Sequence, residues 1–283
     1  MKKTILFIAS LLLPLIGWGQ AQIDTKKVKI SDFTQKITKV VLTGNMFYDG
    51  CLKNEVAARW HVSPFEFCTL DEFKDLQSND NYYFLLTTHG QFKKEQEPGL
   101  TFLTLVKGGK QAEGRIDNML EIVSFPLASV EEPSGRELVF LPAFLNIIQE
   151  YALDSMEKDI NAYTGLANYT MNISKSGNMT LVFSEGDLSS EITPEVKNQY
   201  FDAEVLVLDE EKADEYMSPD KINTLVSYVT MPTSLKPGSY CYKMLIDPNT
   251  NTLYYFRRHK ISKKLGPGFL AEDIKRITAP RKK

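Results

Sequence analysis

The sequence has little of what catalytic and metal sites are usually built from. Its 283 residues include three cysteines and three histidines, and none of them has the Cys-x-x-Cys or His-x-His spacing that holds zinc. The motifs Gly-x-Ser-x-Gly, His-Glu-x-x-His and Gly-x-Gly-x-x-Gly and the phosphate-binding loop are absent as well. We therefore predict no catalytic residues, no cofactor and no metal ion.

Long apolar runs are missing after the amino terminus. Two lysines precede an apolar run over residues 5–18, which Pro14 interrupts, and small residues suit cleavage after Gly19 or Ala21. This pattern predicts a signal peptide over residues 1–21. Because no later segment offers about 18 consecutive apolar residues, we expect no transmembrane segment in the mature chain. The expected location is periplasmic or secreted.

The three cysteines leave two interpretations open. Cys51 and Cys68 are neighbours in the expected strand-helix-strand layout, which is compatible with a disulfide in an oxidising compartment and leaves Cys241 over. An odd number of cysteines without close spacing instead favours three small buried side chains. We prefer the second interpretation.

Negative charge dominates the chain except at its carboxyl end. Residues 257–283 contain ten basic and two acidic side chains, a net charge of +8, whereas residues 22–256 carry a net charge of −13. In a cytosolic protein, a basic end of this kind would suggest a nucleic-acid partner, but the predicted export argues against one. The asymmetry favours an acidic envelope protein, an anionic envelope surface or the acidic part of the same chain as the partner of the basic end.

A similar order of strands and helices is predicted in both halves of the chain. Strands are expected at residues 39–42, 65–68, 82–87 and 100–106, and again at 179–183, 204–208, 224–229, 240–246 and 253–258. We interpret this pattern as an α/β (α+β) fold of two similar β-α-β-α-β-β modules, over residues 22–133 and 168–283. Chance recurrence of a common α/β order is the alternative.

The longest helical pattern lies between the modules. Ser134 and Glu137 have the spacing of a capping box, and Pro142 places the start of the helix nearby. Apolar residues recur on one face, at Leu141, Leu145, Ile148, Ala152, Met156, Ile160 and Tyr163. An apolar stripe of this length has to be buried, so we expect a long central helix over residues 134–167 that joins and braces the two modules.

The last predicted hairpin combines aromatic with basic side chains. Its aromatic residues are Tyr240, Tyr242, Tyr254 and Phe256, and the basic residues that follow are Arg257, Arg258, Lys260, Lys263 and Lys264. Alternation along the strands predicts that the first two tyrosines share one face and that Tyr254 shares a face with Phe256. Aromatic pairing across the sheet explains these residues. The alternative is that all nine form a partner-binding surface, because aromatic anchors and arginine are enriched at binding hot spots.

Residues spread over the chain carry a resemblance to known proteins. The resemblance is to an uncharacterised secreted or periplasmic protein family of Bacteroidetes and rests on Trp60, Phe65, Phe67, Glu72, Phe73, Tyr255, Phe256, His259, Lys260, Ile261, Gly268, Phe269, Asp273 and Ile274. It implies a location in the cell envelope and supplies no activity.

The predicted order of elements is also similar to the α/β modules of the curli secretion lipoprotein and of the amino-terminal part of TolB-type proteins. Those modules serve assembly and protein contact, so the likeness implies a role in protein binding. The chain departs from both, since it has no cysteine directly after the predicted signal peptide and no β-propeller repeat.

Two functions are compatible with these observations. The first is a non-enzymatic binding or assembly protein that contacts a cell-envelope partner, which the missing reactive motifs and the basic, aromatic carboxyl end favour. The alternative is a hydrolase that acts on a glycan or a small molecule through carboxylates in a cleft between the modules. Paired carboxylates need no local motif, and the chain has 36 acidic residues.

Overall fold

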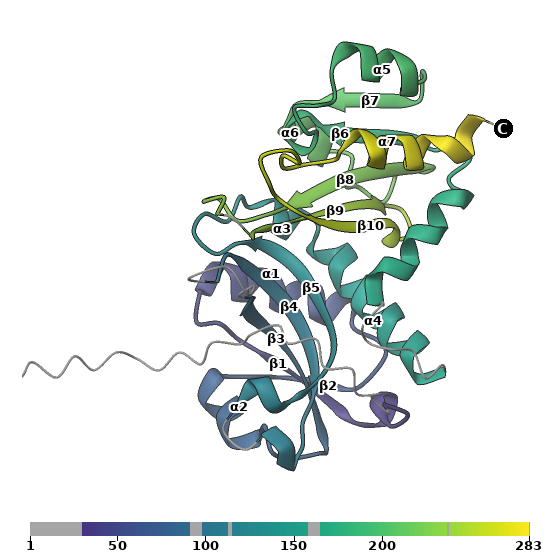
Figure 1. Ribbon diagram of the computed structural model, residues 1–283. Helices are drawn as coiled ribbons and strands as arrows, with labels where there is room; N and C mark the ends of the chain where they lie inside the picture. The colour runs from purple at the N-terminus through teal and green to yellow at the C-terminus, as the bar shows by residue number, and fades with distance from the viewer. Residues whose placement is uncertain (1–29, 91–97, 113–114, 158–164, 237, 283) are drawn as a thin grey trace, which may run out of the picture.

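Two five-stranded mixed sheets form the framework of the protein (Figure 1). The computed structural model describes residues 30–90, 98–112, 115–157, 165–236 and 238–282, so the predicted signal peptide lies outside the described residues. In the view of Figure 1 the first sheet lies below the second, and a helix between them in the sequence, α4, contacts both. Among the described helices, none combines the length and the apolar character needed to cross a bilayer.

The first sheet has the strand order β2-β1-β3-β4-β5. Strand β1 is parallel to β2 and β3, whereas β4 and β5 are added antiparallel. The elements of this module are β1 (Ile37–Val41), α1 (Met46–Arg59), β2 (Phe65–Cys68), α2 (Leu70–Leu76), β3 (Tyr82–Gly90), β4 (Leu100–Lys107) and β5 (Leu120–Ser129). Its two helices cover opposite faces, because α1 buries Leu52 and Val56 in the largest core and α2 packs Phe73 against Phe84 in a separate one.

The second sheet repeats this topology in the order β7-β6-β8-β9-β10. Strand β6 is parallel to β7 and β8, and β9 and β10 are again antiparallel. The elements are β6 (Thr180–Ser184), α5 (Pro194–Tyr200), β7 (Val205–Leu208), α6 (Glu210–Asp214), β8 (Thr224–Thr230), β9 (Tyr240–Asp247), β10 (Thr252–Lys260) and α7 (Ala271–Thr278). Helix α6 faces the largest core through Ala213, whereas α7 packs Ile274 and Ile277 on the other face of the sheet.

The predicted α/β fold with two similar modules is confirmed, and each module has the order β-α-β-α-β-β-β. The first module therefore has one strand more than the sequence pattern predicted. The missed strand, β5, contains Pro126, which pairs with Phe102 beside a β-bulge. Proline cannot donate a hydrogen bond to a strand ladder and is tolerated only at edges and bulges. Its presence therefore argued against a strand in the sequence pattern, although β5 is an edge strand.

The connection between the modules is shorter and more broken than predicted. Two helices, α3 (Arg136–Val139) and α4 (Leu141–Glu157), replace the single helix expected over residues 134–167. Residues 158–164 lie outside the described residues, and a 3-10 helix, η4 (Gly165–Lys175), follows them. Helix α4 contacts β5 of the first module and β10 of the second, in the position of a brace.

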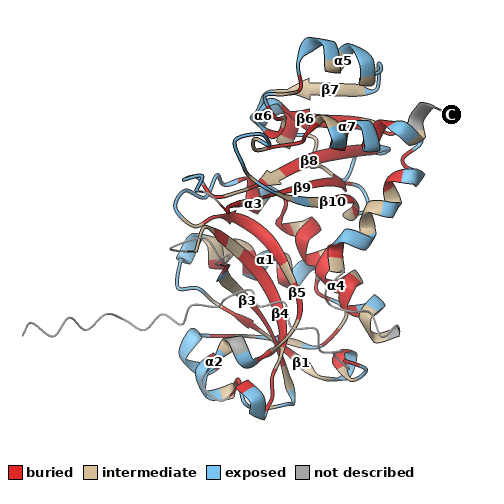
Figure 2. Cartoon of the chain, in the orientation of Figure 1, coloured by how far each residue is buried: buried red, intermediate tan, exposed pale blue. Residues whose placement is uncertain are grey.

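The modules meet in one continuous core and not across an open gap. Tyr228 of β8 packs against Phe140 and Phe144 of the connection, with ring centroids 4.7 Å and 5.1 Å apart. Phe102 of β4 meets Tyr242 of β9 edge to face, with centroids 5.9 Å apart. The buried residues, red in Figure 2, run along both sheets and along one side of α4.

Candidate functional site

The predicted site residues of the β9–β10 hairpin lie on both faces of the second sheet. In the antiparallel register, Arg258 lies opposite Tyr242 and Lys260 lies opposite Tyr240. These residues share the face that carries Phe256 and the largest core. Arg257 alternates to the other face, below α7. The nine residues therefore do not form one surface.

Tyr240 lies between two exposed cations. The guanidinium carbon of Arg258 is 5.2 Å from the centroid of the Tyr240 ring, and Lys260 Nζ is 5.5 Å from the same centroid. Contacts of this kind are favourable because the negative face of an aromatic ring attracts a cation. In the part of the chain that the structure describes, neither Arg258 nor Lys260 has a carboxylate partner.

Two predicted aromatic residues belong to the core that supports this surface. Tyr242 and Phe256 are only 4 % and 8 % exposed, and their ring centroids are 6.0 Å apart. The Tyr242 hydroxyl accepts a hydrogen bond of 3.4 Å from Arg258 Nη1. Tyr242 is thus placed to position Arg258, and the two buried rings are not placed to contact a partner directly.

The expectation that Tyr254 and Phe256 share a face is wrong. The register of β10 shifts between Leu253 and Tyr255, so Tyr254 is an extra residue in a β-bulge. Tyr254 packs beside the core below α7, whereas Phe256 belongs to the largest core. A bulge of this kind reverses the alternation on which the prediction depended.

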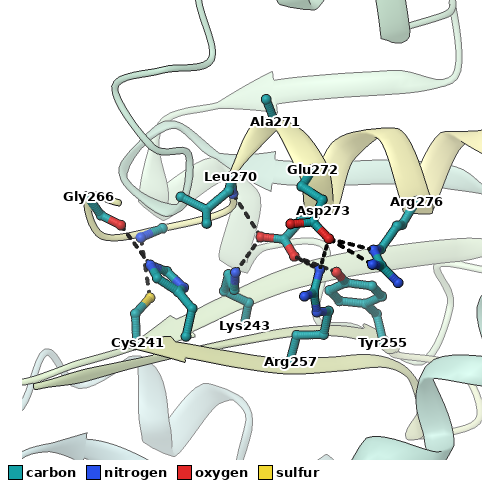
Figure 3. A network of polar contacts seen from close by, with 12 residues as sticks. Cys241, Lys243, Tyr255, Arg257, Gly266, Leu270, Ala271, Glu272, Asp273 and Arg276 are labelled. Carbon is teal, nitrogen blue, oxygen red and sulfur yellow. Dashed lines mark hydrogen bonds and ion pairs between the residues drawn. The ribbon is translucent and has the colours of Figure 1, made fainter. Parts of the chain in front are cut away.

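Arg257 takes part in a buried polar network (Figure 3). Asp273, in the first turn of α7, accepts hydrogen bonds from Arg257 Nη1 at 3.0 Å, from the Tyr255 hydroxyl at 2.6 Å and from its own helix start at Leu270 N, 2.9 Å away. Lys243 of β9 also donates to the same carboxylate. Arg257 therefore serves the fold, which corrects its assignment to a partner-binding surface.

The charges in this network are balanced inside the protein. Lys243 is 1 % exposed and Asp273 is fully buried. Burial alone would raise the pKa of Asp273, but the Lys243 ammonium and the hydrogen bonds from Lys243, Tyr255 and Leu270 together hold it below its ordinary value. A buried, paired carboxylate of this kind is expected to hold elements together, because breaking such a pair leaves an uncompensated charge.

The same face of the hairpin fixes the loop that follows β10. His259 Nε2 donates to Gly266 O over 2.8 Å, and Gly268 N donates to Cys241 Sγ over 3.3 Å. Burial raises the pKa of the Cys241 thiol to about 12, so the thiol is protonated at neutral pH and is a poor nucleophile. The three cysteines are free, which agrees with the preferred interpretation of small, unpaired side chains, although Cys51 is only half-buried.

Lys263 and Lys264 lie at the tip of this loop. Both are exposed, and the Ser262 hydroxyl tightens the turn by accepting from the backbone N–H of Lys264 and of Leu265. Neither lysine has an ion-pair partner among the described residues. We name Tyr240 together with the four unpaired cations Arg258, Lys260, Lys263 and Lys264 the basic surface.

Sequence reasoning missed Arg136, which locks the second module to the connection. The side chain is 5 % exposed, and its guanidinium donates to Asp187 at 2.9 Å, to Asp214 at 2.9 Å and to Ser227 O at 3.1 Å. Asp187 ends the short 3-10 helix η5 (Glu185–Asp187) that follows β6, and Asp214 ends the helix that follows β7. Ligands of open α/β sheets bind at the carboxyl ends of their strands. Here the Arg136 side chain lies where a ligand would bind, and no local sequence motif predicts this position.

A cavity of about 480 Å³ lies between α4 and η4. Its lining includes Tyr151, Tyr169 and Asn172, and Asp154 is the one carboxylate that lines it among the described residues. The Tyr169 hydroxyl donates to Asp154 over 3.3 Å. Since glycoside hydrolysis normally needs two carboxyl groups, this cavity does not favour the glycan hydrolase, which stays a prediction.

Comparisons with known proteins do not extend these observations. A scan against models of protein families matched none, and searches among curated proteins and among solved structures found no match. The resemblance to a Bacteroidetes family therefore stays a prediction.

Proposed function

We propose that the protein is a non-enzymatic binding protein of the periplasm or the cell exterior, and that it contacts an acidic protein of the cell envelope through the basic surface. The observation that carries this proposal is the group of four exposed cations that have no carboxylate partner among the described residues, on a chain whose net charge is −3. Like charges without counter-charges repel one another, so an acidic partner would lower the electrostatic repulsion among the four cations.

The arrangement around Tyr240 favours a protein over a diffuse anionic surface. Arg258 and Lys260 are held against one ring, and Arg258 is also hydrogen bonded to a buried tyrosine. Such contacts fix the direction of the charges, which gives specificity and a faster encounter with a complementary patch. Lys263 and Lys264, on a turn, add charge at the rim.

The test is capture from a Bacteroidetes envelope fraction with the immobilised mature chain. One variant carries Arg258→Gln, Lys260→Gln, Lys263→Gln and Lys264→Gln. Its matched control replaces four exposed lysines on other elements, Lys53, Lys74, Lys212 and Lys275, by glutamine and so removes the same charge.

We expect one reproducible acidic protein on the wild type and on the control, and about tenfold less of it on the basic-surface variant. Capture should also weaken between about 0.15 M and about 1 M salt, because the Debye length falls from about 8 Å to about 3 Å. Equal capture by both variants would refute the proposal. Binding to phosphatidylglycerol vesicles without any captured protein would replace it by an anionic membrane surface.

A further inference from the structure

Strand β10 is an edge strand, and the residues that the structure describes cover only part of its edge. The 3-10 helix η4 lies along the first part of the strand. Thr170 Oγ1 donates to Phe256 O over 2.7 Å and accepts from Phe256 N over 3.1 Å. Asn172 Nδ2 donates to Leu253 O over 2.9 Å. These side chains satisfy three backbone groups on this edge of β10, namely Leu253 O, Phe256 N and Phe256 O.

The remaining outward groups belong to two residues of the basic surface. In an antiparallel pair, residues alternate between those bonded to the neighbouring strand and those whose N–H and C=O point away from it. Since the groups of Phe256 point outward, those of Arg258 and Lys260 do so as well. No described residue forms a hydrogen bond with these four outward groups.

We infer that an extended acidic segment of the partner protein adds as a strand to this open edge, beside Arg258 and Lys260. This inference rests on the proposed function and specifies how the partner binds. Main-chain hydrogen bonds to an exposed edge supply affinity in such complexes, and alternate side chains supply specificity. Arg258 and Lys260 are two positions apart on one face, about 7 Å along the strand, which matches carboxylates at alternate positions of an added strand.

Basic residues on an edge strand also have a second explanation, since lysine at an edge discourages pairing with other strands. The two explanations differ in what the backbone contributes. Strand addition needs N–H groups on one side of the added peptide, whereas attraction between charges alone does not. A probe with blocked N–H groups therefore separates them.

The probe is a fluorescent acetylated peptide of alternating valine and glutamate, seven residues long by choice (about one strand length). Two further peptides are N-methylated, one at every valine and the other at every glutamate. We expect the mature chain to bind the parent peptide and one methylated peptide, and to bind the other methylated peptide about tenfold more weakly, because it loses several hydrogen bonds. Fluorescence polarisation measures all three affinities.

A pair of protein variants tests whether the outward N–H of Arg258 takes part in binding. Arg258→Gln and Arg258→Pro remove the same charge, but proline also removes the outward N–H, which an edge strand tolerates. We expect weaker binding of the parent peptide by Arg258→Gln and a further loss for Arg258→Pro, with both variants folded by thermal melting.

Equal affinities for the three peptides, or equal effects of the two variants, would overturn strand addition. So would a parent peptide that does not bind while the envelope protein is still captured through the basic surface. In these cases the proposed function stands, because capture from the envelope fraction tests it separately.

Discussion

Asp273 links more elements than any neighbouring side chain in its network. It accepts from β9 through Lys243, from β10 through Tyr255 and Arg257, and from the start of its own helix. Glu272, the preceding residue, is exposed and pairs with Arg276 at 2.7 Å on the surface. The two adjacent carboxylates thus allow a matched comparison of buried and exposed charge.

Asp273→Ala is expected to lower the free energy of unfolding by about 3–5 kcal/mol, because it leaves the Lys243 ammonium buried without a carboxylate. Glu272→Ala should cost about 1 kcal/mol or less. Urea unfolding at neutral pH measures both, since the contribution of a carboxylate with a lowered pKa is complete above about pH 4. Similar losses for the two variants would contradict the account of this network.

His259 is expected to make stability depend on pH. Burial lowers the pKa of its imidazole below the ordinary value of about 6.5, so the folded state binds fewer protons than the unfolded state as the pH falls. The free energy of unfolding should therefore decrease from about pH 7 to about pH 5, and His259→Gln should reduce this slope. Burial also lowers the pKa of His89, so part of the slope should remain. An unchanged slope in His259→Gln would show that the ring titrates normally.

At the scale of elements, the edge of β10 depends on η4. The Thr170 hydroxyl donates a hydrogen bond to Phe256 O and accepts one from Phe256 N, so one side chain satisfies two backbone groups. Thr170→Val keeps the shape and removes the oxygen. We expect a loss of about 1–3 kcal/mol in the free energy of unfolding.

Ser174→Ala provides the comparison within the same 3-10 helix. Its hydroxyl donates to Met171 O at an exposed position, and its removal should change stability by less than about 0.5 kcal/mol. Thermal melting of the two variants checks the difference. A Thr170→Val protein as stable as the wild type would show that η4 does not protect this edge.

Sequence patterns located most elements where alternation or helical spacing was undisturbed. The strands at β1 to β4 and β6 to β10 follow from their apolar runs, and Thr193 followed by Pro194 marks the start of α5. Strand β5 was missed because Pro126 is normally a strand breaker. The apolar stripe of the predicted central helix continues past Glu157 at Ile160 and Tyr163, which lie outside the described residues.

Alternation along the strands predicted part of the candidate site. Alternation placed Tyr240 with Tyr242 on one face, as the structure confirms. It failed at Tyr254, since a bulge has no sequence signature here, and at Arg257, whose acidic partner lies on α7. Pairing between distant elements is a property of the folded chain that local patterns do not contain.

At the scale of the whole molecule, Arg136 couples the connection to the second module. Two of its partners, Asp187 and Asp214, end two different short helices of that module, and its guanidinium carbon lies 5.4 Å from the Tyr228 ring centroid. The second module is therefore not an independent unit appended to the first. The carboxyl ends of β6 and β7 lie close to the contact between the connection and this module.

Arg136→Met is expected to lower the free energy of unfolding by about 3–5 kcal/mol, because Asp187 then lies buried without its cation. Arg276→Met removes an exposed arginine from α7 and should cost about 1 kcal/mol or less. Adding Asp187→Asn to Arg136→Met should restore part of the loss, since it removes the uncompensated charge. Chemical denaturation of the three proteins provides the measurement, and a nearly neutral Arg136→Met would refute the coupling.

The most direct test of the central claim is photocrosslinking at the basic surface in intact cells. A benzoylphenylalanine replaces Tyr240 in one strain and Phe47, an aromatic residue of the first module that is 72 % exposed, in a control strain. The account predicts that the Tyr240 position crosslinks an acidic envelope protein, and that the Phe47 position does not. Crosslinks to the same protein from both positions, or none from Tyr240, would contradict it.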